Sequence, residues 1–402
     1  MHLLKRICAL ALAGVLSLSV LTGCKSNGGT SSSTSASVSG STSEPEIVVD
    51  LDTVDDICLF LSDLEPDEVV ATADGIDITA GEMMYWIISC YDTRMMYYYY
   101  YGQAFLPGEE EIYGADVTLA QVVMAEAMQY AMRQRIVEKK ALEAGYTVKQ
   151  EDKDLVQSTL DSLETEAKAQ GVTAELFLKE AGLTEELFIW NCEVDYLYSA
   201  LEDDLFGDNS ANPPTEASIL DFKKENGYYK VKHILLATMD LTTGEALDDE
   251  AKAKKKTQAE DLLNQLKQSS DPQALFDQLM NEYSEDTGLA VYPDGYEFQT
   301  DGTVDPAFEE AALALKDGEI SAIVEGSSGY HIILRLPLEV DMTVDKDSYI
   351  TYMMTEQVNQ WIAESGLKTT DTFEKLDLET IYDRMIAYSD AVSERIAANT
   401  TK

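Results

Sequence analysis

The spacing of apolar residues changes twice along this chain, and these changes constrain its fold more than any other feature. On both sides of a middle segment, apolar residues recur at helical spacing and glycines mark the helix ends. A capping box at Thr79-Ala80-Gly81-Glu82 indicates one helix start. From Tyr229 to Leu336 the pattern predicts the order β-α-α-α-β-β, with strands at 229–237, 320–324 and 330–336 and a helix that starts at Asp305-Pro306. We therefore predict an α+β fold in which a compact module is inserted in a mainly helical domain. The predicted bounds are 228–338 for the module, and 69–227 and 339–402 for the helical domain.

The N-terminal residues have the pattern of an export signal. Lys5 and Arg6 precede an apolar run that is too short to remain as a membrane-spanning helix. The run ends at Leu21-Thr22-Gly23-Cys24, which resembles a bacterial lipobox and is followed by a Ser-rich tract. This pattern predicts removal of residues 1–23, lipidation of Cys24, and a tether over 24–68 at the extracytoplasmic face of the cell membrane. An ordinary signal peptide with a chance cysteine is the alternative.

The charge balance of the chain is strongly acidic. It has 74 Asp and Glu against 29 Lys and Arg, a formal net charge of −45. Such a chain repels the phosphates of nucleic acids, so we exclude nucleic-acid binding. Cys58, Cys90 and Cys192 match no zinc or redox spacing. We therefore assign these three cysteines no metal or redox chemistry.

Two histidines remain once the leader is removed. His233 lies in the first predicted strand of the module and His331 in the last. A single histidine in a strand is most often a packed core residue. Two histidines on strands that can be neighbours in one sheet indicate a shared site instead.

Five sequence blocks around these histidines resemble the successive signatures of the parvulin prolyl isomerases, in the same order. The blocks are residues 231–236, 283–287, 308–312, 318–321 and 329–333. Segments 71–79 and 141–148 resemble the helical domain of the PrsA and SurA foldases. The resemblance extends over residues 69–365 and is strongest to the PrsA-type foldase lipoproteins.

This resemblance implies an enzyme that isomerises X-Pro peptide bonds without a metal, a cofactor or a covalent intermediate. It assigns catalysis to a hydrogen-bonded group of four residues: His233, Asp286, His331 and Ser328. It assigns the proline pocket to four further side chains: Phe298, Val304, Phe308 and Tyr296. The implied partners are unfolded or newly secreted proteins that contain X-Pro bonds, and the membrane through the lipid anchor. A homodimer is left open.

Three positions depart from the parvulin pattern and keep a second hypothesis open. The leucine that usually lines the pocket is absent from the stretch 291–296, where Tyr296 is the candidate replacement. Val304 stands where a methionine is common, and Gly326 stands where the family has a threonine. The second hypothesis is a non-catalytic holdase or assembly chaperone with a degenerate module. A solute-binding lipoprotein is disfavoured because the chain lacks repeated βα units. The tyrosine run at 97–101 fits either a client-binding surface or a helix buried on every side.

Overall fold

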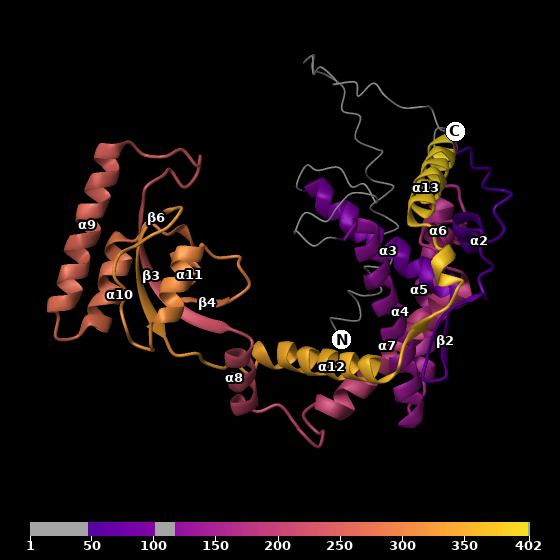
Figure 1. Cartoon of the computed structure of the whole chain (residues 1–402), viewed down its shortest axis with the longest axis horizontal. Helices are drawn as coiled ribbons and strands as arrows, with labels where there is room; N and C mark the ends of the chain where they lie inside the picture. The colour runs from indigo at the N-terminus through magenta and orange to yellow at the C-terminus, as the bar shows by residue number, and fades with distance from the viewer. Residues whose placement is uncertain (1–46, 101–116, 401–402) are drawn as a thin grey trace, which may run out of the picture. The chain divides into compact units, whose positions relative to one another are not determined.

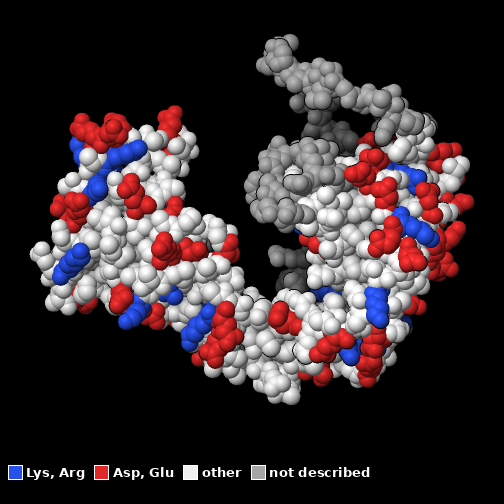
Figure 2. All heavy atoms as spheres, in the orientation of Figure 1, with Lys and Arg blue, Asp and Glu red and all other residues white. Residues whose placement is uncertain are grey.

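The computed structural model describes residues 47–100 and 117–400 (Figure 1). The predicted leader, Cys24 and most of the predicted tether lie outside these ranges. The described residues divide into two compact units, and acidic side chains are spread over the surface of each (Figure 2). One unit contains the residues up to Ala211 and those from Met353 onward, and the other is Asn212–Tyr352. Within the described ranges, no helix combines the length and apolar character needed to cross a bilayer.

The first unit is mainly helical. Its elements are α2 (Ile57–Ser62), β1 (Val69–Ala73), β2 (Ile76–Thr79), α3 (Ala80–Tyr100), α4 (Leu119–Glu143), α5 (Gln150–Ala169), α6 (Ala174–Glu180), α7 (Glu185–Phe206), β7 (Lys368–Thr369), η2 (Phe373–Lys375) and α13 (Leu378–Thr400). Helix α4 packs against both α3 and α7. A small antiparallel sheet has the order β2-β1-β7, so the two ends of the described chain share one sheet.

Segments far apart in the sequence close the core of this helical unit. Met83, Met84 and Ile87 on α3 are fully buried, and each such side chain contributes about 1.5–3 kcal/mol by leaving water. Further along α3, the buried Tyr91 donates its hydroxyl hydrogen to the backbone carbonyl of Leu378 at 3.0 Å. The residues after the module therefore complete the same core as the residues before it.

The helix start indicated at Thr79 forms, although its capping box is incomplete. The Thr79 hydroxyl accepts the backbone N–H of Glu82 at 3.4 Å. The Glu82 side chain is 4% exposed and binds the guanidinium of Arg135 on α4 instead of returning to the cap. A buried carboxylate is stable only with a charged partner, so the ion pair with Arg135 stabilises Glu82 more than a capping hydrogen bond would.

Two further carboxyl groups lie in the interior of the helical unit. Glu180, at the end of α6, is 8% exposed and accepts a hydrogen bond from Ser389 of α13 at 2.7 Å. The Oδ1 atom of Asp92 on α3 is buried and has no hydrogen-bond partner among the described residues. Burial raises the pKa of Glu180 to about 7. Burial, reinforced by the nearby Glu180, also raises the pKa of Asp92 to about 7.

The second unit has both helices and a sheet, and the predicted α+β fold class is confirmed. Its elements are α8 (Glu216–Glu225), β3 (Tyr228–Ala237), α9 (Asp249–Gln268), α10 (Pro272–Tyr283), η1 (Thr287–Ala290), β4 (Tyr296–Gln299), α11 (Pro306–Ala314), β5 (Val324–Glu325), β6 (Gly329–Leu336) and the start of α12 (Asp345–Glu364). The strands form one antiparallel sheet in the order β4-β3-β6-β5. Helices α9 and α10 cover one face, and α11 covers the other.

Two details of this sheet differ from the predicted β-α-α-α-β-β order. Strand β4 lies between α10 and α11, and its four residues are too few for a periodicity to stand out. The strand predicted at 320–324 is instead a single bridge between Ile320 and Leu334, followed by the two-residue β5. The sheet therefore gains an edge strand beside β3, on the side where the site is built.

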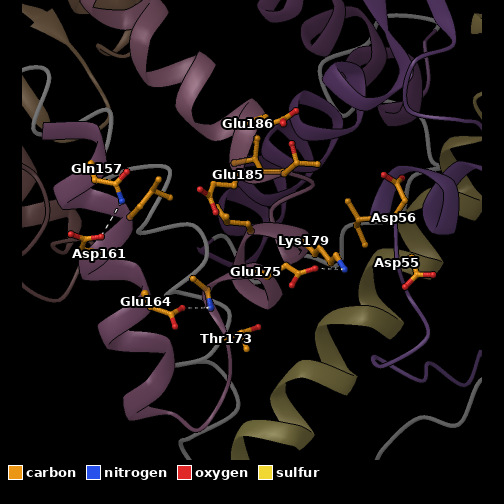
Figure 3. A pocket seen from close by; sticks show the side chains of 16 residues that line it. Asp55, Asp56, Gln157, Asp161, Glu164, Thr173, Glu175, Lys179, Glu185 and Glu186 are labelled. Carbon is orange, nitrogen blue, oxygen red and sulfur yellow. Dashed lines mark hydrogen bonds and ion pairs between the residues drawn. The ribbon is translucent and has the colours of Figure 1, made fainter. Parts of the chain in front are cut away.

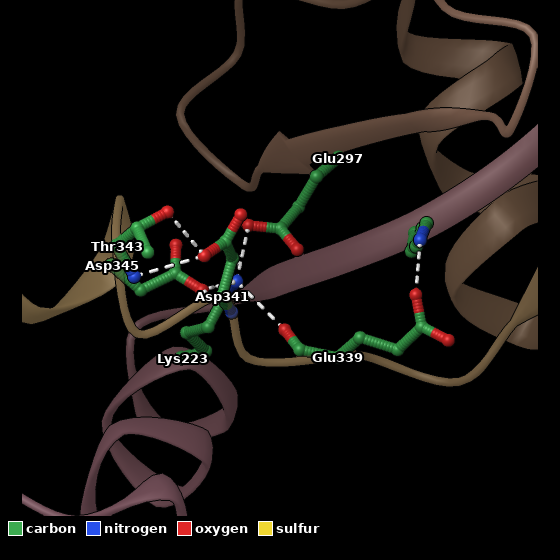
Figure 4. A network of polar contacts seen from close by, with 7 residues as sticks. Lys223, Glu297, Glu339, Asp341, Thr343 and Asp345 are labelled. Carbon is green, nitrogen blue, oxygen red and sulfur yellow. Dashed lines mark hydrogen bonds and ion pairs between the residues drawn. The ribbon is translucent and has the colours of Figure 1, made fainter.

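A buried lysine explains why the second unit, Asn212–Tyr352, includes more residues than the predicted module, 228–338. Lys223 of α8 is 3% exposed, and its Nζ lies 2.8 Å from Glu297 of β4 and 2.9 Å from Asp345 of α12 (Figure 4). The same Nζ donates to the carbonyl of Glu339 at 3.0 Å. These contacts hold α8 and the first residues of α12 onto the sheet.

Candidate active site

The site is organised by the register of β3 against β6. His233 pairs with Ile333, and His331 pairs with Leu235, so the histidines are diagonal neighbours on one face of the sheet. Diagonal positions on adjacent antiparallel strands are about 7–8 Å apart, a distance that two imidazole rings can bridge. The register thereby brings together two residues separated by 98 positions in the sequence.

The two histidines contact each other directly and connect to a carboxylate. His233 Nδ1 lies 3.2 Å from His331 Nδ1, and His233 Nε2 lies 3.2 Å from Asp286 Oδ2. Asp286 begins η1, and its Oδ1 accepts the backbone N–H of Gly288 at 3.0 Å. On the other side, the Tyr296 hydroxyl donates to Asp286 Oδ2. The predicted His233–His331–Asp286 group is therefore brought together.

The charge state of this group follows from its surroundings. Burial alone would raise the pKa of Asp286, but hydrogen bonds from His233, Tyr296 and Gly288 outweigh it and lower the pKa to about 2. Burial, with His233 beside it, lowers the pKa of His331 to about 4. At neutral pH the carboxylate is therefore ionised and His331 is uncharged.

One proton position follows from this hydrogen-bond pattern. An ionised carboxylate only accepts, so His233 Nε2 carries the hydrogen that faces Asp286. The Nδ1 atoms of His233 and His331 lie 3.2 Å apart, so one ring donates to the other there. The contacts from His331 through His233 to Asp286 fix both ring orientations.

An apolar pocket adjoins the two imidazoles. Phe308 of α11 is 4% exposed and meets His233 edge-on at 5.3 Å and His331 edge-on at 5.2 Å between ring centroids. Phe298 and Val304 pack against the same cluster, as predicted for pocket walls. Tyr296 joins this cluster through its ring, which lies 5.6 Å from that of His233.

Tyr296 has a second role that the sequence did not indicate. Its hydroxyl reaches Asp286 only because residue 288 is glycine, since a Cβ there would lie 2.3 Å from the Tyr296 oxygen. The aromatic residue near the usual leucine position therefore both lines the pocket and holds the carboxylate.

The structure does not bring Ser328 into the hydrogen-bonded group of His233, His331 and Asp286. Its hydroxyl bonds neither histidine in the described structure, and its backbone carbonyl accepts the N–H of Thr238 at 3.0 Å. Ser328 is the last residue before β6 and precedes His331 by three residues, about 10 Å along an extended strand.

Asp305 is a site residue that sequence reasoning missed. It was recognised only as the start of α11, where its Oδ1 accepts from the N–H groups of Ala307 and Phe308. Its Oδ2 also accepts the Ser327 N–H at 2.8 Å. A Cβ at Gly326 would lie 3.3 Å from both Asp305 and His331, so glycine there lets the carboxylate and the imidazole approach.

A second hollow lies in the helical unit, with a volume of about 640 Å³ (Figure 3). Its polar side chains are mostly engaged within their own segments. Asp161 accepts from Gln157, Glu175 pairs with Lys179 at 2.8 Å, and Glu164 accepts the Ala174 N–H. Among the described residues, no three His, Cys, Asp or Glu side chains converge as metal ligands. The histidine site is therefore the better candidate for chemistry.

The structure describes only part of the tyrosine run at 97–101, which was predicted to be either a client-binding surface or a buried helix. Tyr98 is 4% exposed in the helical core, as a buried helix requires. Tyr101 and the side chains of its other members lie outside the described residues.

Comparison with known proteins agrees with this geometry. Residues 217–335 match the family model of the PPIC-type PPIase domain. The chain is 28% identical over 202 residues to the foldase protein PrsA of Staphylococcus aureus strain Newman, covering 50% of this chain and 57% of that protein, and strain USA300 gives the same values. The chain thus spans little more than half the length of the curated relatives it matches. These findings confirm the resemblance to PrsA-type parvulin foldases.

Solved structures of similar proteins are also known. A crystal structure of the peptidylprolyl isomerase PrsA from Bacillus anthracis is 21% identical, with a TM-score of 0.24, covering 59% of this chain and 95% of that one. A crystal structure of PrsA from Bacillus subtilis is 20% identical, with a TM-score of 0.23, covering 75% and 91%.

Proposed function

We propose that this chain, which carries a PPIC-type PPIase domain and is similar to PrsA foldases, catalyses cis-trans isomerisation of X-Pro bonds and thereby assists the folding of secreted proteins. The observation that carries the proposal is the contact between His331 and His233, directly beside the Phe308 pocket. The clients would be unfolded or newly secreted chains that contain proline.

The chemistry of the reaction fits an apolar pocket. Amide resonance sets a barrier of about 18–20 kcal/mol to rotation, and the twisted amide loses the charge separation of the planar forms. A pocket that holds the proline ring in apolar surroundings favours this less polar state over both ground states. His331, which lies against Phe308, is neutral and therefore does not stabilise the charge-separated planar amide.

The histidines and Asp286 would act by positioning, since isomerisation breaks no covalent bond and needs no nucleophile. Asp286 holds His233 in one tautomer, and His233 holds His331 against Phe308. Groups fixed in advance need not reorganise when the amide twists, and this lowers the barrier.

The test is the refolding of a model protein whose slow phase is limited by a proline isomerisation. Catalytic amounts of the purified protein should accelerate that phase, whose unaided time is about 10–100 s at 25 °C. An unchanged slow phase would contradict the proposal.

A second candidate is the holdase, and one observation favours it. The helical unit has an apolar groove of about 360 Å³ between α4 and the segment that leads to α13. Its apolar lining is formed by Met124, Ala125, Met128, Ile362, Leu367 and Phe373. Such a groove suits apolar client segments, and methionines adapt to many shapes. Suppression of client aggregation at equimolar protein, with no effect on the proline-limited phase, would favour this function.

We also propose that the mature protein is anchored by lipid on Cys24, at the extracytoplasmic face of the membrane. The support is the Leu21-Thr22-Gly23-Cys24 sequence and the Ser-rich tract after it. Cys24→Ala should abolish lipid labelling and release the protein or leave an uncleaved precursor. Unchanged labelling and membrane fractionation would contradict the anchor.

A further inference from the structure

Aromatic rings continue beyond the proline pocket in an unbroken series. Phe308 meets Phe298 edge-on at 6.2 Å, and Phe298 stacks on Tyr296 at 5.5 Å with an interplanar angle of 8°. Tyr296 in turn contacts Tyr292 at 5.0 Å. Exposure rises along the series, from 4% at Phe308 to 53% at Tyr292. The pocket therefore opens onto an aromatic surface.

The loop that carries Tyr292 is held in one conformation. The N–H groups of Val291 and Tyr292 both donate to the Gly288 carbonyl, at 2.9 and 3.0 Å. The Tyr292 carbonyl accepts from Gly295 at 3.1 Å across Pro293, whose ring fixes its own φ. Gly295 has φ +100, and a Cβ there would lie 2.6 Å from the Val231 carbonyl oxygen.

A rigid exposed tyrosine can bind an apolar side chain with little loss of conformational entropy. Beside it, Val291 is 70% exposed. The two side chains together offer an apolar surface to solvent next to a pocket for proline. At this position they can contact the residue next to a proline bound in the pocket.

The charges around this surface disfavour anionic ligands. Lys232 on β3 pairs with Asp277 at 2.8 Å, and Lys255 on α9 binds Glu285. Asp286 and Asp294 bring carboxylates to the same loop region. An acidic or phosphorylated residue would meet these carboxylates, and both lysines are already paired.

We propose that Val291 and Tyr292 form a second subsite, which receives an aromatic or large aliphatic side chain adjacent to the substrate proline. The proposal rests on the proposed isomerase function. It defines the substrate class as apolar X-Pro segments rather than acidic or phosphorylated ones.

The test compares short peptides in which the residue before or after proline is alanine, phenylalanine, glutamate or phosphoserine. At one of the two positions, phenylalanine should raise kcat/KM over alanine roughly fivefold to tenfold, while glutamate and phosphoserine should lower it. In Tyr292→Ala this phenylalanine-to-alanine ratio should fall to about one. Tyr292→Phe should retain the ratio, because the ring and not the hydroxyl makes the contact.

Leu313→Ala is the matched control, since Leu313 is a 45% exposed apolar residue of α11 outside the aromatic series. It should keep the wild-type ratio. A wild-type ratio near one at both positions, a ratio retained in Tyr292→Ala, or a preference for phosphoserine would overturn the subsite.

Peptide dissociation constants, measured by NMR titration of the same variants, separate this proposal from the isomerase proposal. Binding that favours phenylalanine and loses that preference in Tyr292→Ala, without turnover of any peptide, would support the subsite and contradict the isomerase. Turnover without a preference for phenylalanine would support the isomerase and contradict the subsite.

Discussion

Tyr296 donates its hydroxyl hydrogen to Asp286 on the same carboxylate oxygen that faces His233. The pocket ring and the histidine pair are therefore parts of one hydrogen-bonded structure. A residue that departs from the family pattern supplies this connection, and Gly288 makes room for it. This departure from the family pattern therefore adds a hydrogen bond that holds Asp286 in place.

The first prediction concerns this hydroxyl. Tyr296→Phe keeps the pocket ring and removes one donor to Asp286, so the pKa of Asp286 should rise from about 2 towards its ordinary 3.8. The peptide kcat/KM should fall by roughly threefold to tenfold, because His233 is held less firmly. Carboxyl-carbon NMR gives the pKa, and Tyr292→Phe is the control. An unchanged Asp286 pKa would contradict the bond.

The second prediction concerns the charge of His331. Its folded pKa of about 4 lies below its ordinary 6.5, so the neutral form contributes stability that is present above pH 6.5 and is lost as pH falls through about 4. Imidazole NMR of the purified protein should show one histidine that does not titrate between pH 8 and 5. The assignment is made by comparison with His233→Gln and His331→Gln. Titration of His331 near 6.5 would show that the site is open to water.

The third prediction tests the buried lysine. Lys223→Met should lower the free energy of unfolding of the second unit by about 2–3 kcal/mol, because Glu297 and Asp345 lose their partner in a partly buried place. Lys230→Met is the control, since its partner Glu339 is 73% exposed and solvent screens the pair, so this substitution should destabilise the unit much less.

Hydrogen exchange of β3 and β6 amides can measure this change. All three tryptophans, Trp86, Trp190 and Trp361, lie in the other unit, so fluorescence would not report it. Equal loss of protection in the two variants would mean that the buried contacts of Lys223 stabilise the second unit no more than the exposed Lys230–Glu339 pair does.

The fourth prediction concerns the acids inside the helical unit. The folded pKa of Glu180, about 7, lies above its ordinary 4.5, so the stability that its protonated form contributes is full below pH 4.5 and lost as pH rises through about 7. Glu180→Gln should remove this dependence. Between pH 4.5 and 8, the free energy of unfolding of Glu180→Gln should fall by about 3 kcal/mol less than that of the wild type.

Urea unfolding followed by tryptophan fluorescence measures this effect. Glu175→Gln is the control, because that carboxylate is 72% exposed on the same helix and its removal should leave the pH dependence unchanged. Parallel pH curves for wild type and Glu180→Gln would mean that Glu180 is ionised in the folded state at neutral pH.

Much of the candidate site could be predicted from the sequence. His233 and His331 were informative because they are the two histidines beyond the predicted leader and lie in strand-like segments. Asp286 and Phe308 were identified by their place in ordered sequence blocks. Each of these residues sits where a local pattern already determines its environment.

The remaining features depend on contacts between segments that no local pattern encodes. The bond from Tyr296 to Asp286 requires both the unpredicted β4 and the space above Gly288. Ser328 was assigned from the resemblance alone, and only the structure shows that it lies in the turn before β6, about 10 Å along the chain from His331. Asp305 was recognised as a helix cap, and its approach to His331 became visible only in three dimensions.

The most direct test is the rate of X-Pro isomerisation in a short peptide, measured by exchange NMR with and without the purified protein. We expect acceleration by wild type and by the control Leu313→Ala. Losses of about tenfold or more in kcat/KM are expected for His233→Ala, His331→Ala and Phe308→Ala. Hydrogen exchange of the second unit must show that each variant remains folded. Wild-type rates in all three folded variants, or no acceleration by the wild-type protein, would contradict the account.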